Sequence, residues 1–517
     1  MNRDAARPPA VRAPGTPSSV GRLAGMVQPP QLADGLCVEP VPESSQKWVH
    51  RVDEYGFDWW GVAAGTTATY VSGRFYGPTV DINGLGSGPW LVANSGTPDA
   101  LLVKYDRDGS MVWSREVDGE GYFEKVHVAP DGDVYTVGWL RGPGTVASGV
   151  SSPVNLNSAG GDAMFVARLD PSGNYRWIRE IGASTGTISI DPSDLAVDES
   201  GSVYVVGNHG GCVDFNPGAG THSITAPSGA RYGFLLKLNA SGDFEWVRPM
   251  YATTGSHVYP TGVTVAGPRV AIAGHLHGSP ILFGPTPTGG HVTLETAGEW
   301  EYDSFVASFE ADGDLYNAVC LGNGATDDSA VGLASNAAGE VFVTGYAYSS
   351  GGLAFGTNDV VSATGPNGWV GYVAKLGIKL DLEWIVGAAP EADSHCYAMA
   401  IAIDATGCNL YVTGSFQGSV DFDPSSAIDL EEAPATPRSD GSVHSYDANH
   451  AFLWALDHNG RHSWVETPSF GPEPGHGVQG SGGSGRDIAV SDLGRLSVVG
   501  WLFDCGISTE GAFIYRK

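Results

Sequence analysis

Two neighbouring stretches, DAMFVARLDPSGNYRWIRE (162–180) and DPSDLAVDESGSVYVVGN (191–208), contain the unit that decides the fold. In both, Val, Ile, Leu and Phe recur in short runs of alternating polarity, which is typical of β-strands. The links between the runs contain Asp and Gly, as in the turn from Asp170 to Gly173, and this chemistry favours tight hairpins. We therefore predict four strands per unit, which we label a (194–198), b (202–207), c (162–170) and d (174–180).

The unit recurs along the whole chain after the first 45 residues, as two columns of residues show. An aromatic residue in strand d recurs at Trp48, Trp113, Trp177, Trp246, Tyr316, Trp384 and Trp464. A glycine at the end of strand b recurs at Gly73, Gly138, Gly207, Gly274, Gly345, Gly414 and Gly500. Each column has one member per unit, so self-similarity at this period predicts seven repeats. We expect the aromatic column to pack between units and the glycines to allow close approach of the backbone.

The two ends of the repeat region complement each other. The first element, WVHRV (48–52), is a d strand without a c strand before it, and the last, GAFIYRK (511–517), is a c strand without a d strand after it. Pairing the two would remove the open sheet edges of an unfinished array. The sequence therefore predicts an all-β fold over residues 46–517: a seven-bladed β-propeller of four-stranded antiparallel blades, closed by pairing of the N-terminal d strand with the C-terminal c strand.

Composition agrees with this fold class and excludes several functions. The chain has 74 Gly and 32 Pro with 16% charged residues, which suits many short strands and turns. The net charge of −30 would repel a phosphate backbone, so we expect no nucleic-acid partner. No apolar run is long enough to cross a membrane as a helix, and we expect a monomer.

Residues 1–45 are rich in Pro, Ala, Arg and Gly, and we predict that they form a disordered leader. They lack the apolar core of a secretory signal. Six cysteines, at 37, 212, 320, 396, 408 and 505, lie too far apart in sequence for a C-x-x-C zinc motif. Disulfides and isolated buried thiols are both compatible with their spacing.

The repeat resembles a known bacterial family. The pattern of DAMFVARLDPSGNYRW, DESGSVYVVG, VDFNPG (213–218) and VDFDP (420–424) is similar to that of the SBBP β-propeller repeat. The resemblance implies a propeller that works outside the cell or at the cell envelope, although the missing export signal leaves the cytoplasm open. It implies no defined activity, so it points to no catalytic residue.

Long connections follow strand b, as at 209–231 and 276–301, and they share one propeller face with the connections from d to a. Long loops are often functional, so we place any binding on this long-loop face. The alternative is that the connections only add short strands, since VDING, VDFNP, PILFG, GLAFG and VDFDP each look like one. Our leading hypothesis is a non-enzymatic binding or adhesion scaffold presenting this face to a protein or glycan. Two alternatives remain: a polysaccharide hydrolase or lyase with its site on the same face, and a purely structural repeat module.

Two sets of residues are candidate metal ligands, and otherwise we expect no cofactor. Histidines on one side of a strand, with others in nearby connections, are typical of zinc sites, and surface histidines are the alternative: His275, His277, His257 and His291. Oxygen ligands alternating on extended segments suit calcium, and simple turn chemistry is the alternative: Asp81 with Asn83, Asp214 with Asn216, and Asp421 with Asp423.

The middle of strand a, which should line the propeller axis, contains a column of small or apolar residues. It reads Val62, His127, Ala196, Thr264, Ala334, Ala402 and Ala489. His127 is its one titratable member, and we expect a hydrogen-bonded core histidine there. The column therefore argues against catalysis on the axis.

Overall fold

The computed structural model describes most of residues 48–517, so the predicted leader at 1–45 lies outside the described residues. The other positions outside them are 46–47, 53–56, 76–79, 82–89, 92–96, 184–188, 279, 297–301, 322–326, 349–352, 356–358, 362–367, 392–393, 426, 434–448, 469–481 and 504–509. Among the described residues, no helix is long and apolar enough to cross a membrane.

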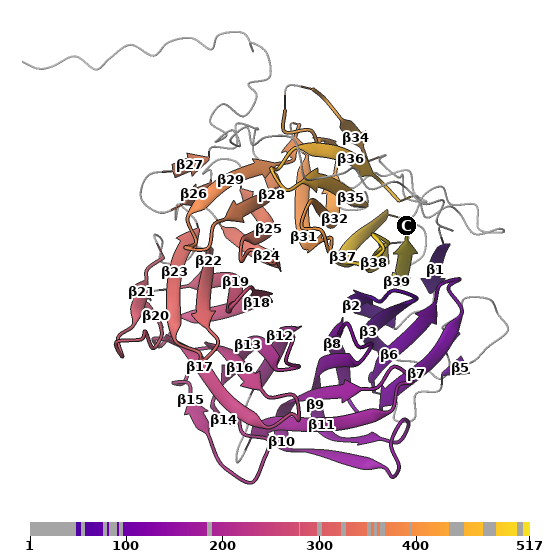
Figure 1. The fold of residues 1–517 in the computed structure, drawn as a ribbon, viewed down its shortest axis with the longest axis vertical. Helices are drawn as coiled ribbons and strands as arrows, with labels where there is room; N and C mark the ends of the chain where they lie inside the picture. The colour runs from indigo at the N-terminus through magenta and orange to yellow at the C-terminus, as the bar shows by residue number, and fades with distance from the viewer. Residues whose placement is uncertain are drawn as a thin grey trace, which may run out of the picture.

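The structure is all-β, and its antiparallel sheets stand side by side around a ring (Figure 1). Each main sheet has a core of four strands that are hydrogen-bonded in order from the centre of the ring to its rim, and we call them inner, second, third and outer. Sheets 1 to 3 are β2 (Phe57–Ala64), β3 (Ala68–Phe75), β6 (Asp99–Asp106), β7 (Met111–Val117); β8 (Gly121–Val128), β9 (Val134–Val146), β10 (Val154–Leu169), β11 (Tyr175–Ala183); and β12 (Ser189–Val197), β13 (Val203–Gly210), β16 (Tyr232–Leu238), β17 (Phe244–Ala252). Sheets 4 and 5 are β18 (His257–Ala266), β19 (Arg269–His277), β22 (Tyr302–Glu310), β23 (Leu315–Leu321); and β24 (Asp328–Ser335), β25 (Val341–Tyr348), β28 (Trp369–Leu376), β29 (Leu382–Gly387). Sheets 6 and 7 are β31 (His395–Ile403), β32 (Asn409–Gln417), β35 (His450–Asp457), β36 (His462–Glu466); and β37 (Gly482–Val490), β38 (Leu496–Phe503), β39 (Glu510–Arg516), β1 (Trp48–Val52).

Sheet 7 joins the two ends of the repeat region. β1 pairs antiparallel with β39, with Trp48 opposite Arg516 and Val52 opposite Ala512. Sheet 7 also contacts sheet 1, because Arg516 donates hydrogen bonds to the carbonyls of Asp106 and Arg107 over 3.3 and 3.1 Å. Segments more than 400 residues apart in sequence (|i−j| = 409 and 410) therefore lie side by side in the ring (Figure 1).

Five of the long connections after second strands form short hairpins of their own. Four of these hairpins pair with an outer strand or its continuation in the sheet before, whereas β4 and β5 form a separate two-stranded sheet. In sheet 2 the connection instead extends β9 and β10. The hairpin strands are β4 (Val80–Asp81), β5 (Trp90–Leu91), β14 (Cys212–Asp214), β15 (Ser223–Thr225), β20 (Ile281–Phe283), β21 (Val292–Leu294), β26 (Leu353–Phe355), β27 (Asp359–Val361), β33 (Ser419–Asp421) and β34 (Leu430–Glu432), with β30 (Ala389–Pro390) continuing sheet 5. The predicted extra strands are thus confirmed, and they cover outer sheet edges that would otherwise be open.

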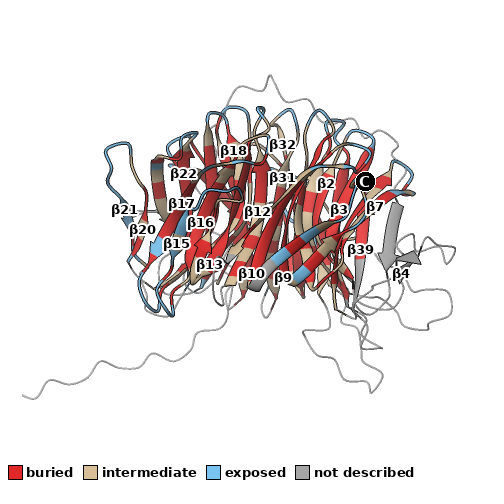
Figure 2. Ribbon diagram, turned by 90° about the horizontal axis from the view of Figure 1, so that it is seen from below, coloured by how far each residue is buried: buried red, intermediate tan, exposed pale blue. Residues whose placement is uncertain are grey.

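The second and third strands are buried on both faces because a neighbouring sheet packs on each side (Figure 2). Their sequences are accordingly apolar along most of their length, whereas in the outer strand β7 only Trp113 and Val117 are buried. One hydrophobic cluster joins Leu102 and Trp113 of sheet 1 to Phe123 and Phe165 of sheet 2. Another joins Val499 and Ile514 of sheet 7 to sheet 1.

A hydrogen bond from the outer-strand tryptophan links each of several sheets to the next. The indole N–H of Trp113 donates to the carbonyl of Pro171 over 3.3 Å, and that of Trp177 to the carbonyl of Ala240 over 3.0 Å. The same bond runs from Trp246 to Ala311 and from Trp384 to His458. Each acceptor lies in the turn between the third and outer strands of the next sheet, so these four members of the aromatic column pack between repeats as predicted.

An arginine two residues after the tryptophan reinforces this link. Arg179 stacks over its own Trp177 at 5.7 Å and donates to the carbonyl of Gly242 over 3.1 Å. Arg248 does the same with Trp246 at 5.1 Å and Gly313 at 2.7 Å. Where Tyr316 replaces tryptophan, Asn317 supplies the link instead by donating to the carbonyl of Lys379 over 2.7 Å.

The turn that accepts these bonds requires glycine for two separate reasons. Gly173 has a φ of +81°, which L-residues with a side chain rarely adopt. A Cβ there would also lie 2.9 Å from the ring of Trp113 and 2.8 Å from Arg115. The tryptophan therefore packs against the turn itself, and the turn has no room for a methyl group.

We expect Gly173→Ala to lower the free energy of unfolding by about 2 to 4 kcal/mol, combining left-handed backbone strain with overpacking against Trp113. Gly289→Ala is the matched control, because Gly289 has a φ of +79° but nothing lies within 4 Å of its Cβ position. Chemical denaturation should show that the free energy of unfolding falls by about 1 to 2 kcal/mol less in the control than in Gly173→Ala. Equal losses would show that the turn does not pack against the tryptophan as described.

Candidate functional site

The glycine column shapes the edge of the ring that carries the long connections. A Cβ on Gly345 would collide with the carbonyl oxygen of Ser329 in the inner strand, and one on Gly274 with that of Tyr259. The predicted close backbone approach is thus confirmed. Directly after this contact, the inner strand has a β-bulge, as between Ala330 and Gly332. Bulges re-aim the neighbouring side chains, and here they do so at the same level in each sheet.

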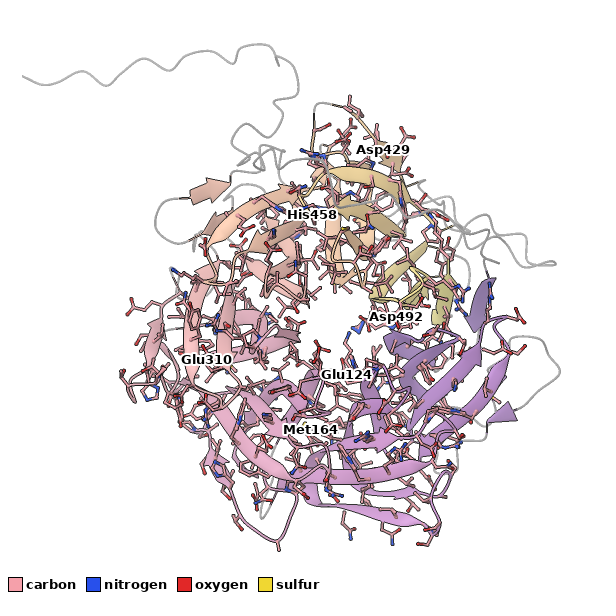
Figure 3. All side chains as sticks on the ribbon, in the orientation of Figure 1. Glu124, Met164, Glu310, Asp429, His458 and Asp492 are labelled. Carbon is pink, nitrogen blue, oxygen red and sulfur yellow. The ribbon has the colours of Figure 1, made fainter. Side chains whose placement is uncertain are left out.

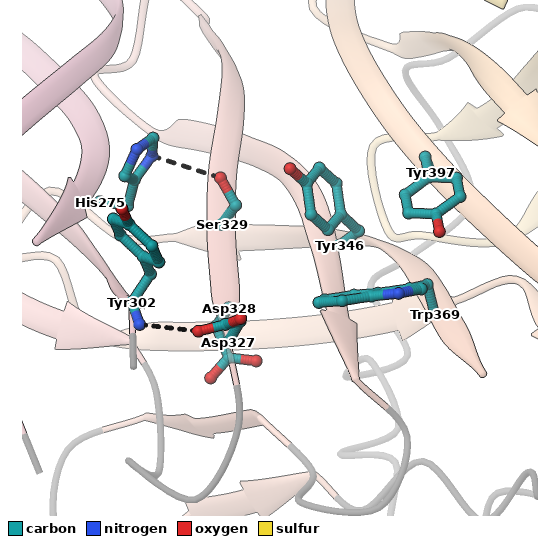
Figure 4. Close-up of a pocket in the computed structure, with 8 residues that line it drawn as sticks. All are labelled: His275, Tyr302, Asp327, Asp328, Ser329, Tyr346, Trp369 and Tyr397. Atoms are coloured by element: carbon teal, nitrogen blue, oxygen red, sulfur yellow. Dashed lines mark hydrogen bonds between the residues drawn. The ribbon is translucent and has the colours of Figure 1, made fainter. Parts of the chain in front are cut away.

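A cavity of about 380 Å³ opens at this edge between sheets 4, 5 and 6 (Figure 4). Its walls are mostly aromatic, and each side chain lies at or near the end of its strand. The lining residues are His275, Tyr302, Asp327, Asp328, Ser329, Tyr346, Trp369 and Tyr397. They come from the edge where second strands end and third strands begin, so the cavity lies on the face where we expected binding. We call it the aromatic pocket.

The aromatic rings of the pocket meet edge to face. The rings of Tyr346 and Trp369 have centroids 5.4 Å apart at an interplanar angle of 85°. Tyr346 also meets Tyr397 at 5.2 Å and 78°, and Trp369 contacts Tyr348 at 5.2 Å and 74°. Such T-shaped contacts hold the rings rigidly and leave some ring faces directed away from each other.

The polar side chains of the pocket are carboxylates, a hydroxyl and a neutral imidazole. Asp327 is exposed and accepts a hydrogen bond from the backbone N–H of Tyr302 over 3.0 Å, while Asp328 is fully buried. His275 lies 3.4 Å from the hydroxyl of Ser329, and burial lowers the pKa of His275 to about 4. At neutral pH His275 therefore contributes no positive charge to the pocket.

The proposed zinc ligands lie in and beside this pocket. The rings of His257 and His277 stack at 5.6 Å, and Tyr302 contacts His275 and His277 at 5.3 and 5.1 Å. His291 contacts Tyr251 instead, on the outer strand of sheet 3. In the part of the chain that the structure describes, no group of three or more His, Cys, Asp or Glu side chains could hold a metal ion. Zinc binding stays a prediction. In the structure these histidines pack against each other and against tyrosine rings.

The proposed calcium ligands take part in turns. One carboxylate oxygen of Asp214 accepts the backbone N–H groups of Asn216 and His222, and one of Asp421 does the same for Asp423 and Asp429. The amide oxygen of Asn216 and the carboxylate of Asp423 accept the N–H groups of Gly218 and Ser425. Asp81 and Asn83 lie outside the residues whose side chains are described. Calcium therefore remains a prediction, and the turn bonds already use one side-chain oxygen of each of the four described residues.

The valine and phenylalanine of the V-D-F motif are structural. Val213 and Phe215 are fully buried, and Phe215 contacts Phe234 at 5.1 Å. Phe422 contacts Phe452 at 5.0 Å in the same way. The motif therefore anchors an insertion hairpin to the neighbouring sheets, with its aspartate closing the hairpin turn.

A second polar cluster faces the centre of the ring, where Glu124 is labelled in Figure 3. Lys125 forms an ion pair with Asp487 over 3.1 Å, joining sheets 2 and 7. The other oxygen of Asp487 accepts the backbone N–H of Val62 over 2.9 Å. Asp194 of sheet 3 accepts the N–H of Val263 over 2.9 Å. These bonds between sheets place carboxylates and a lysine around the axis.

Burial perturbs the protonation of this central cluster. Burial raises the pKa of Glu124 to about 7 and that of Asp194 to about 6. Burial lowers the pKa of Lys125, but the charges of Asp487, Asp194 and Glu124 outweigh this effect and raise it overall. Glu124 can therefore bind or release a proton near neutral pH.

Sequence reasoning missed both the aromatic pocket and the central cluster. One member of the predicted axial column is wrong by one position. In sheet 1, Ala63 lies opposite Tyr70, as His127 lies opposite Tyr135 in sheet 2, so Ala63 and not Val62 is equivalent to His127. Burial lowers the pKa of His127 to about 4, so it is neutral at pH 7. The charged residues sit at the bulge a few positions earlier, and a bulge has no signal in a single sequence.

Comparisons with known proteins identify the repeat. Residues 176–208 match the SBBP family model, described as a beta-propeller repeat. An uncharacterized WD repeat-containing protein of Acanthamoeba polyphaga mimivirus is 23% identical over 231 residues, which is 41% of this chain and 16% of that protein. The polysaccharide lyase Uly1 superposes with a TM-score of 0.42 at 9% identity, covering 90% of this chain and 98% of the lyase. An arabinanase of Bacillus subtilis gives 0.25 at 9% identity, covering 66% and 97%. At these similarities, neither structure says what the present chain binds.

The pKa of Glu124 predicts how stability depends on pH. Its folded value of about 7 lies above the ordinary value of 4.5, so the native state holds this proton more tightly than the unfolded state does. The resulting stabilisation is complete below pH 4.5 and is lost as the pH rises through 7. We expect Glu124→Gln to remove this loss. The difference in the free energy of unfolding between the variant and the wild type should shift in favour of the variant by about 1 to 3 kcal/mol from pH 4 to pH 8.

The measurement is urea denaturation of both proteins across this pH range. Glu199→Gln, at an exposed turn, is the control and should follow the wild-type curve. Parallel curves for Glu124→Gln and wild type would show that Glu124 titrates normally.

Proposed function

We propose, for this β-propeller repeat protein, that sheets 1 to 7 are the seven blades of a single propeller domain over residues 46–517 and that β1 and β39 close the ring. The support is that sheet 7 contacts sheet 1 with the same kinds of bond that join other neighbouring sheets. Arg516 reaches the turn of sheet 1 as Arg168 reaches Ala240 in the turn of sheet 3. Val499 and Ile514 pack with Trp59 of sheet 1.

On this disc, the function that we infer is non-enzymatic binding of a glycan at the aromatic pocket. The observation that carries it is the pocket itself: Tyr346, Trp369 and Tyr397 converge from two sheets on a cavity with a few polar groups. Its volume of about 380 Å³ lies within the usual range for small-ligand sites. Sugars present apolar C–H faces and hydroxyls, which aromatic rings and carboxylates such as Asp327 can bind together.

Among the described residues, those that line this site lie at the ends of strands. Several of the connections pair with the preceding sheet, so their hairpins already have a structural role. The pocket residues instead belong to core strands or, like Asp327, directly adjoin one. Sites on regular elements hold their side chains more precisely than sites on loops.

A second candidate function is catalysis at the central cluster, because Glu124 has a pKa of about 7. A general acid or base works best with a pKa near the operating pH. Asp194 and Asp487 supply further carboxylates around the same axis. Under this alternative, a polysaccharide-cleaving activity would be lost in Glu124→Gln and kept in Trp369→Ala.

We also propose that the protein works at the cell envelope or outside the cell. Cys408 is disulfide-bonded, and disulfides persist mainly in oxidising compartments. Cys212, Cys320 and Cys396 are free thiols.

The binding proposal is tested with Trp369→Ala and Tyr346→Ala against an array of neutral, acidic and amino oligosaccharides, with hits quantified by isothermal titration calorimetry. Loss of an aromatic anchor at the centre of a site costs about 2 kcal/mol, so we expect roughly thirtyfold weaker binding.

Tyr251→Ala is the matched control, because Tyr251 is 37% exposed and lies outside the pocket. It should bind like the wild type, and all three variants should melt as folded proteins. Glycan binding that survives both pocket variants would place the site elsewhere, and no binding across the array would refute glycan recognition.

A further inference from the structure

The aromatic pocket has the form of a cage for a cation. Tyr346 stands nearly perpendicular to both Trp369 and Tyr397, at 85° and 78°. The ring planes of Trp369 and Tyr397 differ by only 35°, and their centroids are 6.0 Å apart. These two rings therefore have similar orientations, and the ring of Tyr346 stands across both. The electron-rich faces of such rings attract cations, and Trp and Tyr are the strongest of the aromatic side chains in this respect.

The same face of the protein contains a cage that its own arginine fills. In sheet 2, Tyr122 and Trp139 stack at 5.3 Å, and the guanidinium of Arg141 lies over Trp139 at 4.9 Å. Asp162 accepts a hydrogen bond from Arg141 over 2.9 Å. Tyr122 also contacts Trp60 of sheet 1 at 4.4 Å, and Arg74, which is paired with Asp58 over 2.8 Å, lies over Trp60 at 4.8 Å. Aromatic ring, cation and carboxylate are thus combined twice where sheets 1 and 2 meet at this edge of the ring.

Strand register shows that sheet 5 keeps part of this unit without its cation. Trp139 in sheet 2 and Tyr346 in sheet 5 are equivalent, because each directly follows a column glycine. Two residues further on, Arg141 lies opposite Asp162 in sheet 2. At the equivalent positions of sheet 5, Tyr348 lies opposite Trp369. Aromatic residues therefore occupy the positions of the ion pair. Within the described residues, no Lys or Arg lies over the ring of Tyr346 or Trp369.

The charges of the pocket favour a positive occupant. Its described lining residues include the carboxyl groups of Asp327 and Asp328 but neither Lys nor Arg. His275 adds no positive charge at neutral pH, because burial lowers its pKa to about 4. An anionic sugar such as a uronate would meet these carboxylates and a chain of net charge −30.

From this geometry we propose that the aromatic pocket binds the ammonium group of an amino sugar. This inference rests on the proposed glycan function and narrows its ligand class. The ammonium group lies against the faces of Tyr346 and Trp369, with Asp327 as its counter-charge, and the sugar ring extends along the remaining walls. The ligand supplies from outside the cation that Arg141 supplies from within sheet 2.

The test compares two ligands with one skeleton: the glucosamine tetramer, with free amines, and its fully N-acetylated form. Calorimetry uses the full chain at mildly acidic pH and low salt. A partly desolvated cation–π contact gives the free amine a preference of roughly tenfold. Added salt should reduce this preference, because the ion pair with Asp327 is screened.

Conservative variants separate the cage from the fold. Tyr346→Phe keeps the ring and should keep the preference, whereas Tyr346→Leu should abolish it. Asp327→Asn should reduce the preference severalfold, and the surface control Glu199→Gln should leave it unchanged. Tetramethylammonium chloride probes the cation site alone, and its binding should weaken in Tyr346→Leu.

The outcomes distinguish this inference from the function beneath it. Equal or tighter binding of the N-acetylated tetramer overturns ammonium recognition and leaves glycan binding intact. Failure of every sugar to bind overturns the glycan function itself. An unchanged preference in Tyr346→Leu, with the variant melting normally, overturns the cage as the place of recognition.

Discussion

The hydrogen bond between an outer-strand indole and the turn of the next sheet is the interaction on which the ring depends. Trp177 illustrates it: its N–H donates to the carbonyl of Ala240, while Arg179 covers the ring and bonds to Gly242. Because the donor is in one repeat and the acceptor in the next, each sheet fixes the position of its neighbour. The link pairs the N–H of a half-buried indole, so losing the acceptor would leave this donor without its protein partner at a packed interface.

This regular stacking explains why binding groups can gather at one edge. The bulge after each inner-strand contact repeats at the same height, so side chains of neighbouring sheets arrive at the same level of the ring. Tyr346 and Tyr397 meet because sheets 5 and 6 are held in register. The same principle brings Lys125 of sheet 2 to Asp487 of sheet 7. The scaffold is thus repetitive, whereas the sites arise where repeats differ.

Features that recur in every repeat could be predicted from the sequence, whereas features that arise where the repeats differ could not. Strands, turns and the two columns recur, so positions such as Gly345 and Trp384 could be assigned roles before the structure. The motif that contains Val213 and Phe215 correctly predicted an extra strand. The aromatic pocket combines residues of three neighbouring sheets that do not recur in the other repeats, so no motif marks it. The register of Val62 was wrong by one position, because the turn between the inner and second strands is one residue shorter in sheet 1 than in sheet 2: Ala63 pairs with Tyr70, and His127 with Tyr135.

The closed ring is the central claim, and sheet 7 is where it is most directly tested. Removing residues 511–517 deletes most of β39, which pairs with both β38 and β1 and carries Phe513 and Ile514 into two hydrophobic clusters. The measurement is thermal unfolding of this truncated chain beside the intact one, with aggregation followed by light scattering. Our account predicts that the truncated chain aggregates or loses its cooperative transition. A truncated chain that unfolds cooperatively at the temperature of the intact protein would contradict it.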